Sequence, residues 1–236
     1  MLCKSPLTAI PSPFFPTQKK HGNYTSKFFS LYDQDSEKPI STITENPSKK
    51  EGTIKVEFQT LGDSKLGISR YPNFDYNAEG GTGRGKGRKS SDGSSNEIMV
   101  SFDIGSLYIP PLNYGTTRFL GLPLPPFLKI DIVPEKFDGI INEGTGKVDL
   151  EFRAKFCFSA GSLYRPPPLM VETILTTEEA KGVIKNGKGE RMDDKGKCRL
   201  VGVATVDPIH DFLMNAFLGL PTECIADLNA QIFVTS

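Results

Sequence analysis

The sequence predicts a mainly β protein, an antiparallel barrel or a two-layer sandwich with one short helix. The clearest evidence is residues 147–158, where apolar and polar residues alternate as in a long strand with one buried face. The chain also contains 23 glycines and 18 prolines, and 10% of its residues are aromatic although it has no tryptophan. This composition favours short strands and many turns over long helices. The alternative is an α+β fold with the helix packed on a curved antiparallel sheet.

Residues 1–32 have the composition of an organelle transit peptide. They contain four lysines, many Ser and Thr residues and no acidic residue, the first being Asp33. Prolines interrupt the apolar run that a secretory signal needs, and arginine, which mitochondrial presequences favour, is missing before Arg70. We therefore expect delivery to the chloroplast, either to the stroma or to the thylakoid surface. A mitochondrial presequence and an ordinary disordered tail are the alternatives.

The remainder of the chain is predicted to be a linker followed by one β-rich domain. Residues 33–52 are polar and are expected to be disordered. Residues 53–236 are expected to form a single domain with about eight to ten strands. Turns are expected where Asn, Asp and Gly cluster, at 142–144, 186–187 and 194–196. The expected strands are 54–60, 98–102, 128–132, 147–158, 169–176, 198–206 and 228–234.

Residues 80–96, with the sequence GGTGRGKGRKSSDGSSN, are predicted to be a flexible exposed loop. Four basic residues, Arg84, Lys86, Arg88 and Lys89, lie in this segment. We expect these charges to be solvated, and contact with a phosphate-rich partner is the alternative. The segment resembles a nucleotide-binding loop only in its glycine content, and we expect no cofactor.

One helix is expected directly after Asp207, which is placed to cap it, and Pro208 suits its first turn. Apolar residues then recur at the spacing of one helical face, and Gly219 and Pro221 end the segment. We expect this face to pack on the core, and a membrane-surface or partner-binding helix is the alternative. The face consists of Ile209, Phe212, Leu213, Ala216 and Phe217.

Two phrases occur twice in the chain. Gly-Ser-Leu-Tyr-x-Pro-Pro begins at Gly105 and at Gly161, and Phe-Leu-Gly-Leu-Pro begins at Phe119 and at Phe217. In a structural interpretation each copy ends a strand, because glycine allows a bend, Leu and Tyr pack, and Pro-Pro cannot donate hydrogen bonds to a neighbouring strand. In a functional interpretation the tyrosines of the two copies form a two-fold site.

The composition excludes some classes of function and assigns no catalytic residue. A formal net charge of zero, from 28 basic and 28 acidic residues, argues against a nucleic-acid binder. The apolar runs are too short for a membrane-spanning helix. With four cysteines, two histidines and no CxxC pair, we expect no metal site. His210 lies beside Asp211, but we expect a solvated or capping histidine rather than a general base.

Several segments resemble a group of plant plastid-targeted proteins with no assigned activity. The resemblance lies in residues 105–111, 119–134, 161–177 and 200–224, and it covers roughly residues 54–236. It implies a plastid location and supplies no catalytic residues.

We therefore expect a non-catalytic soluble plastid protein that binds an apolar or amphipathic ligand, or a partner protein, at the mouth of the barrel or sheet. The aromatic face of the strand at 147–158 suggests Phe152 and Phe156 as ligand contacts, and the repeated phrases add Tyr108 and Tyr164. The expected partner is a lipid, a pigment or a thylakoid protein. The alternatives are an enzyme with a site near His210 and a thylakoid-associated assembly or structural factor.

Overall fold

The computed structural model describes residues 53–89 and 96–235, so the predicted transit peptide and linker lie outside the described residues. Twelve strands form one antiparallel sheet and two form a separate hairpin. The mainly β class with one short helix is confirmed, with more strands than expected. The strands are β1 (Ile54–Thr60), β2 (Ser64–Ile68), β3 (Phe74–Tyr76), β4 (Thr82–Lys89), β5 (Glu97–Phe102), β6 (Thr117–Phe119), β7 (Leu122–Pro123), β8 (Leu128–Asn142), β9 (Lys147–Ala160), β10 (Leu169–Thr176), β11 (Glu179–Lys181), β12 (Asn186–Lys188), β13 (Lys197–Val206) and β14 (Thr222–Thr235). The helical elements are the 3₁₀ turn η1 (Ile104–Ser106) and the helix α1 (Phe212–Leu218).

Eight of the strands close into a ring. Their order is β1-β4-β5-β8-β9-β10-β13-β14, and β14 pairs with β1 to complete it. Strands β10 and β13 share a single ladder pair, Thr176 with Val201. Near this pair the Thr173 hydroxyl donates a hydrogen bond to the carbonyl of Val203 at 2.8 Å. A side chain thus reinforces a seam that the main chain barely closes, and the ring is close to a barrel without being strictly one.

The strands follow the alternation of the sequence. In β1 every second residue is buried and the residues between are exposed. In β9 Val148 and Leu150 are fully buried, whereas the opposite face carries charged side chains, with Lys155 lying 2.5 Å from Glu135 of β8. The long strand with one wet face that the sequence predicts is therefore confirmed.

Aromatic side chains fill the ring where β1, β4, β5 and β8 meet. The rings of Phe102 and Phe137 are stacked with centroids 4.6 Å apart, and Phe58 meets both edge-on at 5.9 and 5.1 Å. Phe152 meets Phe137 edge-on at 5.9 Å. Buried aliphatic residues surround these rings, so side chains rather than an open volume occupy this part of the ring.

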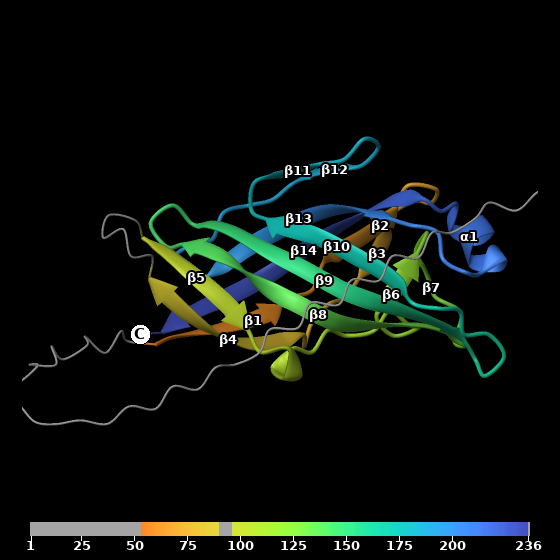
Figure 1. Cartoon of the computed structure of the whole chain (residues 1–236), viewed down its shortest axis with the longest axis horizontal. Helices are drawn as coiled ribbons and strands as arrows, with labels where there is room; N and C mark the ends of the chain where they lie inside the picture. Colours follow the sequence, from red (N-terminus) through yellow and green to blue (C-terminus); the bar gives the residue numbers. More distant parts are fainter. Residues whose placement is uncertain (1–52, 90–95, 236) are drawn as a thin grey trace, which may run out of the picture. The chain divides into compact units, whose positions relative to one another are not determined.

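At the other end of the long strands the sheet extends beyond the ring. Strands β2, β3, β6 and β7 continue the sheet from β14, and Figure 1 shows β6, β7 and α1 together at the end opposite β5. Two smaller clusters pack there. One lies under α1 and contains Leu169, Val171, Ala204, Val206, Met214 and Leu218. The other contains Tyr76, Ala78, Leu112 and Leu124.

The flexible loop predicted at 80–96 is wrong for residues 82–89, because these form β4, inside the ring between β1 and β5. Its glycines face the core, and the basic residues between them face outward. A Cβ at Gly87 would lie 2.6 Å from Cγ2 of Ile98, and one at Gly83 would lie 2.7 Å from Cδ1 of Leu107. The glycines of β4 allow the strand to pack closely on its neighbours, whereas the glycine-rich sequence suggests a flexible loop. Residues 90–95 lie outside the described residues.

The helix begins later than predicted, and its packing face is different. Asp211, not Asp207, caps α1, and its carboxylate accepts the N–H of Met214 at 2.7 Å. Gly219 ends the helix with a φ of 71°, as expected. With about two turns, α1 presents one i, i+4 pair to the core, Met214 and Leu218. The apolar face predicted to pack on the core is therefore largely exposed.

Strands β11 and β12 form a hairpin arm on the outside of the ring. The turn predicted at Asn186-Gly187 is wrong, because these residues belong to β12 and the chain turns earlier. The turn is fixed by the carboxylate of Glu223, which accepts the N–H groups of Val183, Ile184 and Lys185 at 2.6, 2.7 and 2.8 Å. A carboxylate that is distant in sequence thus determines where the arm turns.

Candidate functional site

Large apolar side chains are exposed at the end of the sheet that carries α1. Figure 1 shows α1, β6 and β7 at this end. They come from the β6–β7 hairpin, from the chain directly before β8, from the turn after β9 and from α1. Their exposed fractions range from 49% to 96%. Isolated exposed apolar residues are normal, whereas a group of them marks a contact surface. This group, the apolar end, consists of Leu120, Leu122, Phe127, Leu163, Phe212, Leu213 and Phe217.

The start of α1 is fixed to the turn after β9. The Tyr164 hydroxyl donates to Oδ1 of Asp211 at 2.7 Å, and the same oxygen accepts the N–H of Met214. The N–H of Gly161 donates to the carbonyl of Phe127 at 2.8 Å, which holds this turn beside the start of β8. The exposed residues of α1, of this turn and of the chain before β8 are therefore neighbours.

The hydrogen-bonded pair of Tyr164 and Asp211 has a structural role rather than a catalytic one. Partial burial, and then the hydrogen bond to Asp211, raise the pKa of Tyr164 to about 12. The N–H of Met214, and then the Tyr164 hydroxyl, lower the pKa of Asp211. Tyrosine therefore stays neutral and aspartate stays ionised at neutral pH. The pair positions the helix, and neither group has the pKa near neutrality that suits a general acid or base.

The end of α1 is fixed to the chain between β2 and β3. The Tyr71 hydroxyl donates to the carbonyl of Phe217 at 2.6 Å, and Nη1 of Arg70 donates to the carbonyl of Ala216 at 2.5 Å. The Tyr71 ring also lies 6.3 Å from the ring of Phe119, at the end of β6. Helix α1 and the turn between β6 and β7 are thus joined through one aromatic residue.

The turn between β6 and β7 places a leucine where a small or polar residue is usual. Leu120 and Gly121 have φ values of 52° and 78°, and they connect the paired residues Phe119 and Leu122, as in a type I′ hairpin turn. A leucine rarely adopts positive φ, and this one is exposed and contributes nothing to the core. Leucine at this position therefore adds backbone strain and leaves most of its side chain in solvent.

The four residues predicted to contact a ligand lie in different surroundings. Phe156 and Tyr164 pack on the same cluster under α1. Phe152 packs on the core of the ring. Tyr108 is exposed and pairs with Thr82 of β4. The structure thus groups two of the four residues and places the other two elsewhere.

The two Gly-Ser-Leu-Tyr copies share only part of their structure. Tyr108 and Tyr164 each pair with a strand through an isolated antiparallel bridge. Leu107 is buried, whereas Leu163 is exposed, so the interpretation that both leucines pack is wrong for the second copy. Leu107 reaches the core because it occupies the space that Gly83 leaves open.

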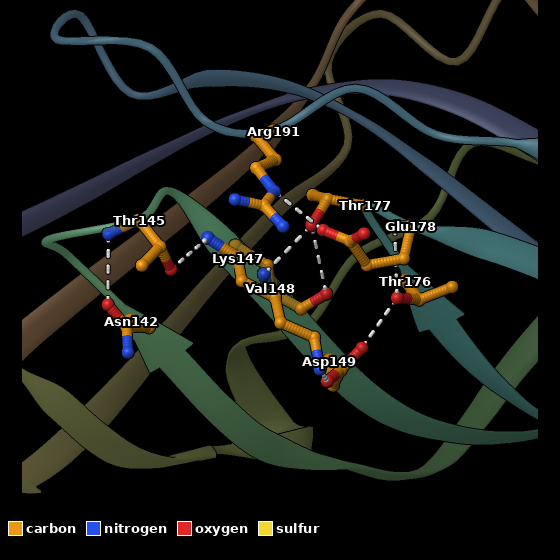
Figure 2. Close-up of polar contacts among 9 residues, drawn as sticks. All are labelled: Asn142, Thr145, Lys147, Val148, Asp149, Thr176, Thr177, Glu178 and Arg191. Atoms are coloured by element: carbon orange, nitrogen blue, oxygen red, sulfur yellow. Dashed lines mark hydrogen bonds and ion pairs between the residues drawn. The ribbon is translucent and has the colours of Figure 1, made fainter.

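A hollow of 530 Å³, lined by charged and threonine side chains together with Ile174, Ala180 and Val203, lies outside the seam between β10 and β13, beside β11. Figure 2 shows polar contacts along its side, where the Thr176 hydroxyl donates to Oδ1 of Asp149 at 2.5 Å and Lys147 lies 3.0 Å from Oδ2. Arg191 donates to Glu178 at 2.6 Å (Figure 2), and this bond lowers the pKa of Glu178. The hydrogen bond to Asp149 raises the pKa of Lys147. These charged side chains pair with one another, which favours a structural role for them.

The side chains that the sequence offers for catalysis or metal binding lie in surroundings that explain them structurally. His210 is exposed, and the neighbouring Asp211 bonds to Tyr164 rather than serving a catalytic pair. Burial raises the pKa of the Cys198 thiol to about 12 and that of Cys224 to about 11, as for cysteines in an apolar core. Residues 53–89 and 96–235 contain no group of three His, Cys, Asp or Glu side chains that could hold a metal ion.

Comparisons of the chain with protein-family models, with curated proteins and with solved structures gave no match. In the part of the chain that the structure describes, no helix combines the length and the hydropathy required to cross a membrane. The assignment of a function therefore rests on the apolar end.

Sequence reasoning missed most of the apolar end. It assigned the stripe of α1 to the core, and it singled out neither Leu120 nor Phe127 as a contact residue. The repeated Phe-Leu-Gly-Leu-Pro phrase carried the signal, because both copies lie at this end. In the first copy the leucines on both sides of Gly121 are exposed, whereas in the second copy Phe217 is exposed and Leu218 is buried.

Proposed function

We propose that this chain is a non-catalytic plastid protein that binds an apolar or amphipathic partner through its apolar end. The observation that carries the proposal is the exposure of seven large apolar side chains from segments that hydrogen bonds hold together. Exposed apolar surface is unfavourable in water by roughly 25 cal/mol per Å². A partner at this end removes that surface from water and so gains binding free energy.

The rigidity of the apolar end supports the proposal. Asp211 and Tyr164 fix the start of α1, and Arg70 and Tyr71 fix its end. A surface that is already ordered loses little conformational entropy on binding. The strained Leu120 fits the same role, because it holds an apolar side chain in solvent at a turn tip.

The composition of residues 1–32 supports the plastid part of the proposal, since it is basic, rich in Ser and Thr and free of acidic residues. Within a plastid, the partner classes with suitable chemistry are lipids, pigments and the apolar faces of thylakoid proteins. Each of these presents apolar surface of the kind that the exposed leucine and phenylalanine side chains match.

Hydrogen exchange of the full chain, with and without micelles of dodecyl maltoside, tests the proposal. This neutral amphiphile offers an apolar surface with no charge. Micelles are expected to protect peptides covering residues 118–128, 160–165 and 209–218, and to leave the arm turn at 182–185 unchanged. Equal exchange with and without micelles, or protection confined to another surface, would overturn the proposal.

A pair of matched variants makes the test specific. The double variant Leu163→Ser and Phe212→Ser removes two side chains that are almost fully exposed, so the fold is expected to be retained and the protection lost. Val183→Ser is the control, because Val183 is 95% exposed but lies in the turn of the arm. The control is expected to retain the protection at the apolar end.

A further inference from the structure

We infer that the apolar end is a docking surface for a lipid bilayer with anionic headgroups. The inference rests on the proposed function and names its partner as a membrane surface rather than a single ligand molecule or a protein. It depends on two observations, the way in which the apolar side chains project and the charge of the residues around them.

The apolar side chains project from turns and from a short helix instead of lining a concave site. Leu120 lies in a two-residue turn, Leu163 in the turn after β9, and Phe212 in the first turn of α1, and all three are exposed. Neighbouring projections of this kind insert side by side into the interfacial layer of a bilayer. A small ligand requires a cavity, whereas the cluster beneath α1 is packed with side chains.

Three exposed arginines lie next to these projections. Arg70 donates to the carbonyl of Ala216 at the end of α1, Arg118 precedes the turn between β6 and β7, and Arg165 lies in the turn after β9. Among the described residues none of the three forms an ion pair, although Arg118 lies opposite Asp75 in the ladder. The guanidinium groups of Arg118 and Arg165 are therefore available to lipid phosphates, to which arginine often binds in bidentate fashion, whereas that of Arg70 already donates to Ala216.

Two of the segments at the apolar end contain no acidic residue. Residues 118–128 and 160–169 each contain one arginine and no acid. Asp207 and Asp211 flank the start of the helical segment, but Oδ1 of Asp211 already accepts two hydrogen bonds. Apolar projections next to unpaired arginines complement an anionic bilayer, where each basic residue near the surface adds to the affinity. A two-fold contact with a second copy would instead bring the arginines of both copies together.

Co-sedimentation of the full chain with vesicles tests the inference. Vesicles of phosphatidylcholine alone are compared with vesicles that contain roughly 30% phosphatidylglycerol, at low and high salt. The anionic vesicles are expected to bind at least about tenfold more tightly, and salt is expected to reduce this difference. All variants are made in the full chain, so that the four lysines of residues 1–32 contribute equally to each measurement.

Two double variants separate the charged from the apolar contribution. Arg118→Gln with Arg165→Gln is expected to lower the affinity for anionic vesicles about tenfold and to leave the protection by neutral micelles unchanged. The control is Arg84→Gln with Arg88→Gln, two exposed arginines of β4, which is expected to bind like the original chain. Leu163→Ser with Phe212→Ser is expected to abolish binding to vesicles and micelles alike.

The outcomes distinguish this inference from the proposed function. If micelles protect the apolar end but no vesicle binds, or if neutral and anionic vesicles bind equally, the inference is overturned and the proposed function stands. The same holds if the Arg118/Arg165 and Arg84/Arg88 variants lose affinity equally. If neither micelles nor vesicles interact with this end, both are overturned. Formation of a dimer that the Leu163/Phe212 variant abolishes would identify a second copy as the partner instead.

Discussion

The Tyr71 hydroxyl donates a hydrogen bond to the carbonyl of Phe217 at 2.6 Å, and the two rings lie 5.6 Å apart. Tyr71 also contacts Phe119, and the centroids of these two rings lie 6.3 Å apart. Tyr71 therefore connects the two Phe-Leu-Gly-Leu-Pro phrases. In both phrases the glycine, Gly121 or Gly219, has positive φ and reverses the chain. The repeated sequence therefore forms two adjacent turns at one end of the sheet.

The contacts of Tyr71 predict a graded loss of stability. Tyr71→Phe removes only the hydrogen bond and is expected to lower the free energy of unfolding by about 1 kcal/mol. Tyr71→Ala also removes both ring contacts, and a loss of about 2 kcal/mol is expected. Urea unfolding measures both changes. Tyr114→Phe, at an exposed tyrosine, is the control and is expected to change little. Equal stability of the three variants would show that Tyr71 does not hold α1.

The sequence predicted the strands well where period two was visible. Strand β1 has the predicted bounds, and β10 has them too, although its prediction rested on apolar residues on both faces rather than on alternation. The pattern failed at β4, because the inward positions hold glycine and carry no apolar signal, although the basic residues alternate with them. It also failed for α1, where the phase of the helix depends on whether Asp207 or Asp211 is the cap. The candidate site was unpredictable for a related reason, since exposure of an apolar residue depends on its neighbours in space.

The close packing of β4 predicts that its glycines are intolerant of substitution. Gly87→Ala places a Cβ 2.6 Å from Cγ2 of Ile98 and is expected to lower the free energy of unfolding by about 2 kcal/mol. The control is Gly105→Ala, where the Cβ meets only the carboxylate of Asp103, at 3.4 Å, and the change is expected to stay within about 0.5 kcal/mol. Chemical denaturation of both variants provides the comparison. A Gly87 variant as stable as the control would mean that β4 is not packed as described.

The seam between β10 and β13 predicts a specific role for one hydroxyl. Thr173→Val keeps the shape of the side chain but leaves the carbonyl of Val203 without its 2.8 Å hydrogen bond. A loss of about 1–2 kcal/mol is expected in the free energy of unfolding, with faster amide exchange along β10. Thr205→Val, at an exposed position of β13, is the control and is expected to be nearly neutral. If both substitutions have the same effect, the seam does not depend on this hydrogen bond.

The anchor of the arm predicts an effect of acid on local structure. The N–H groups of Lys185, Val183 and Ile184 lower the pKa of Glu223 below its ordinary value of 4.5. Because the folded pKa is depressed, the stabilisation is complete above pH 4.5 and is lost as the pH falls through the folded pKa. Protection factors of these three amides are therefore expected to stay constant above pH 4.5 and to decrease in more acidic solution.

Glu223→Gln tests whether the carboxylate causes this acid step. A neutral amide accepts more weakly than a carboxylate, so the amides of Val183, Ile184 and Lys185 are expected to exchange about tenfold faster at neutral pH. The variant is also expected to show no decrease below pH 4.5, because it has no group to protonate there. Glu179→Gln, which removes an exposed charge on β11, is the control and is expected to retain the acid step. An acid step that persists in the Glu223 variant would assign it to another group and would leave the turn of the arm without its proposed anchor.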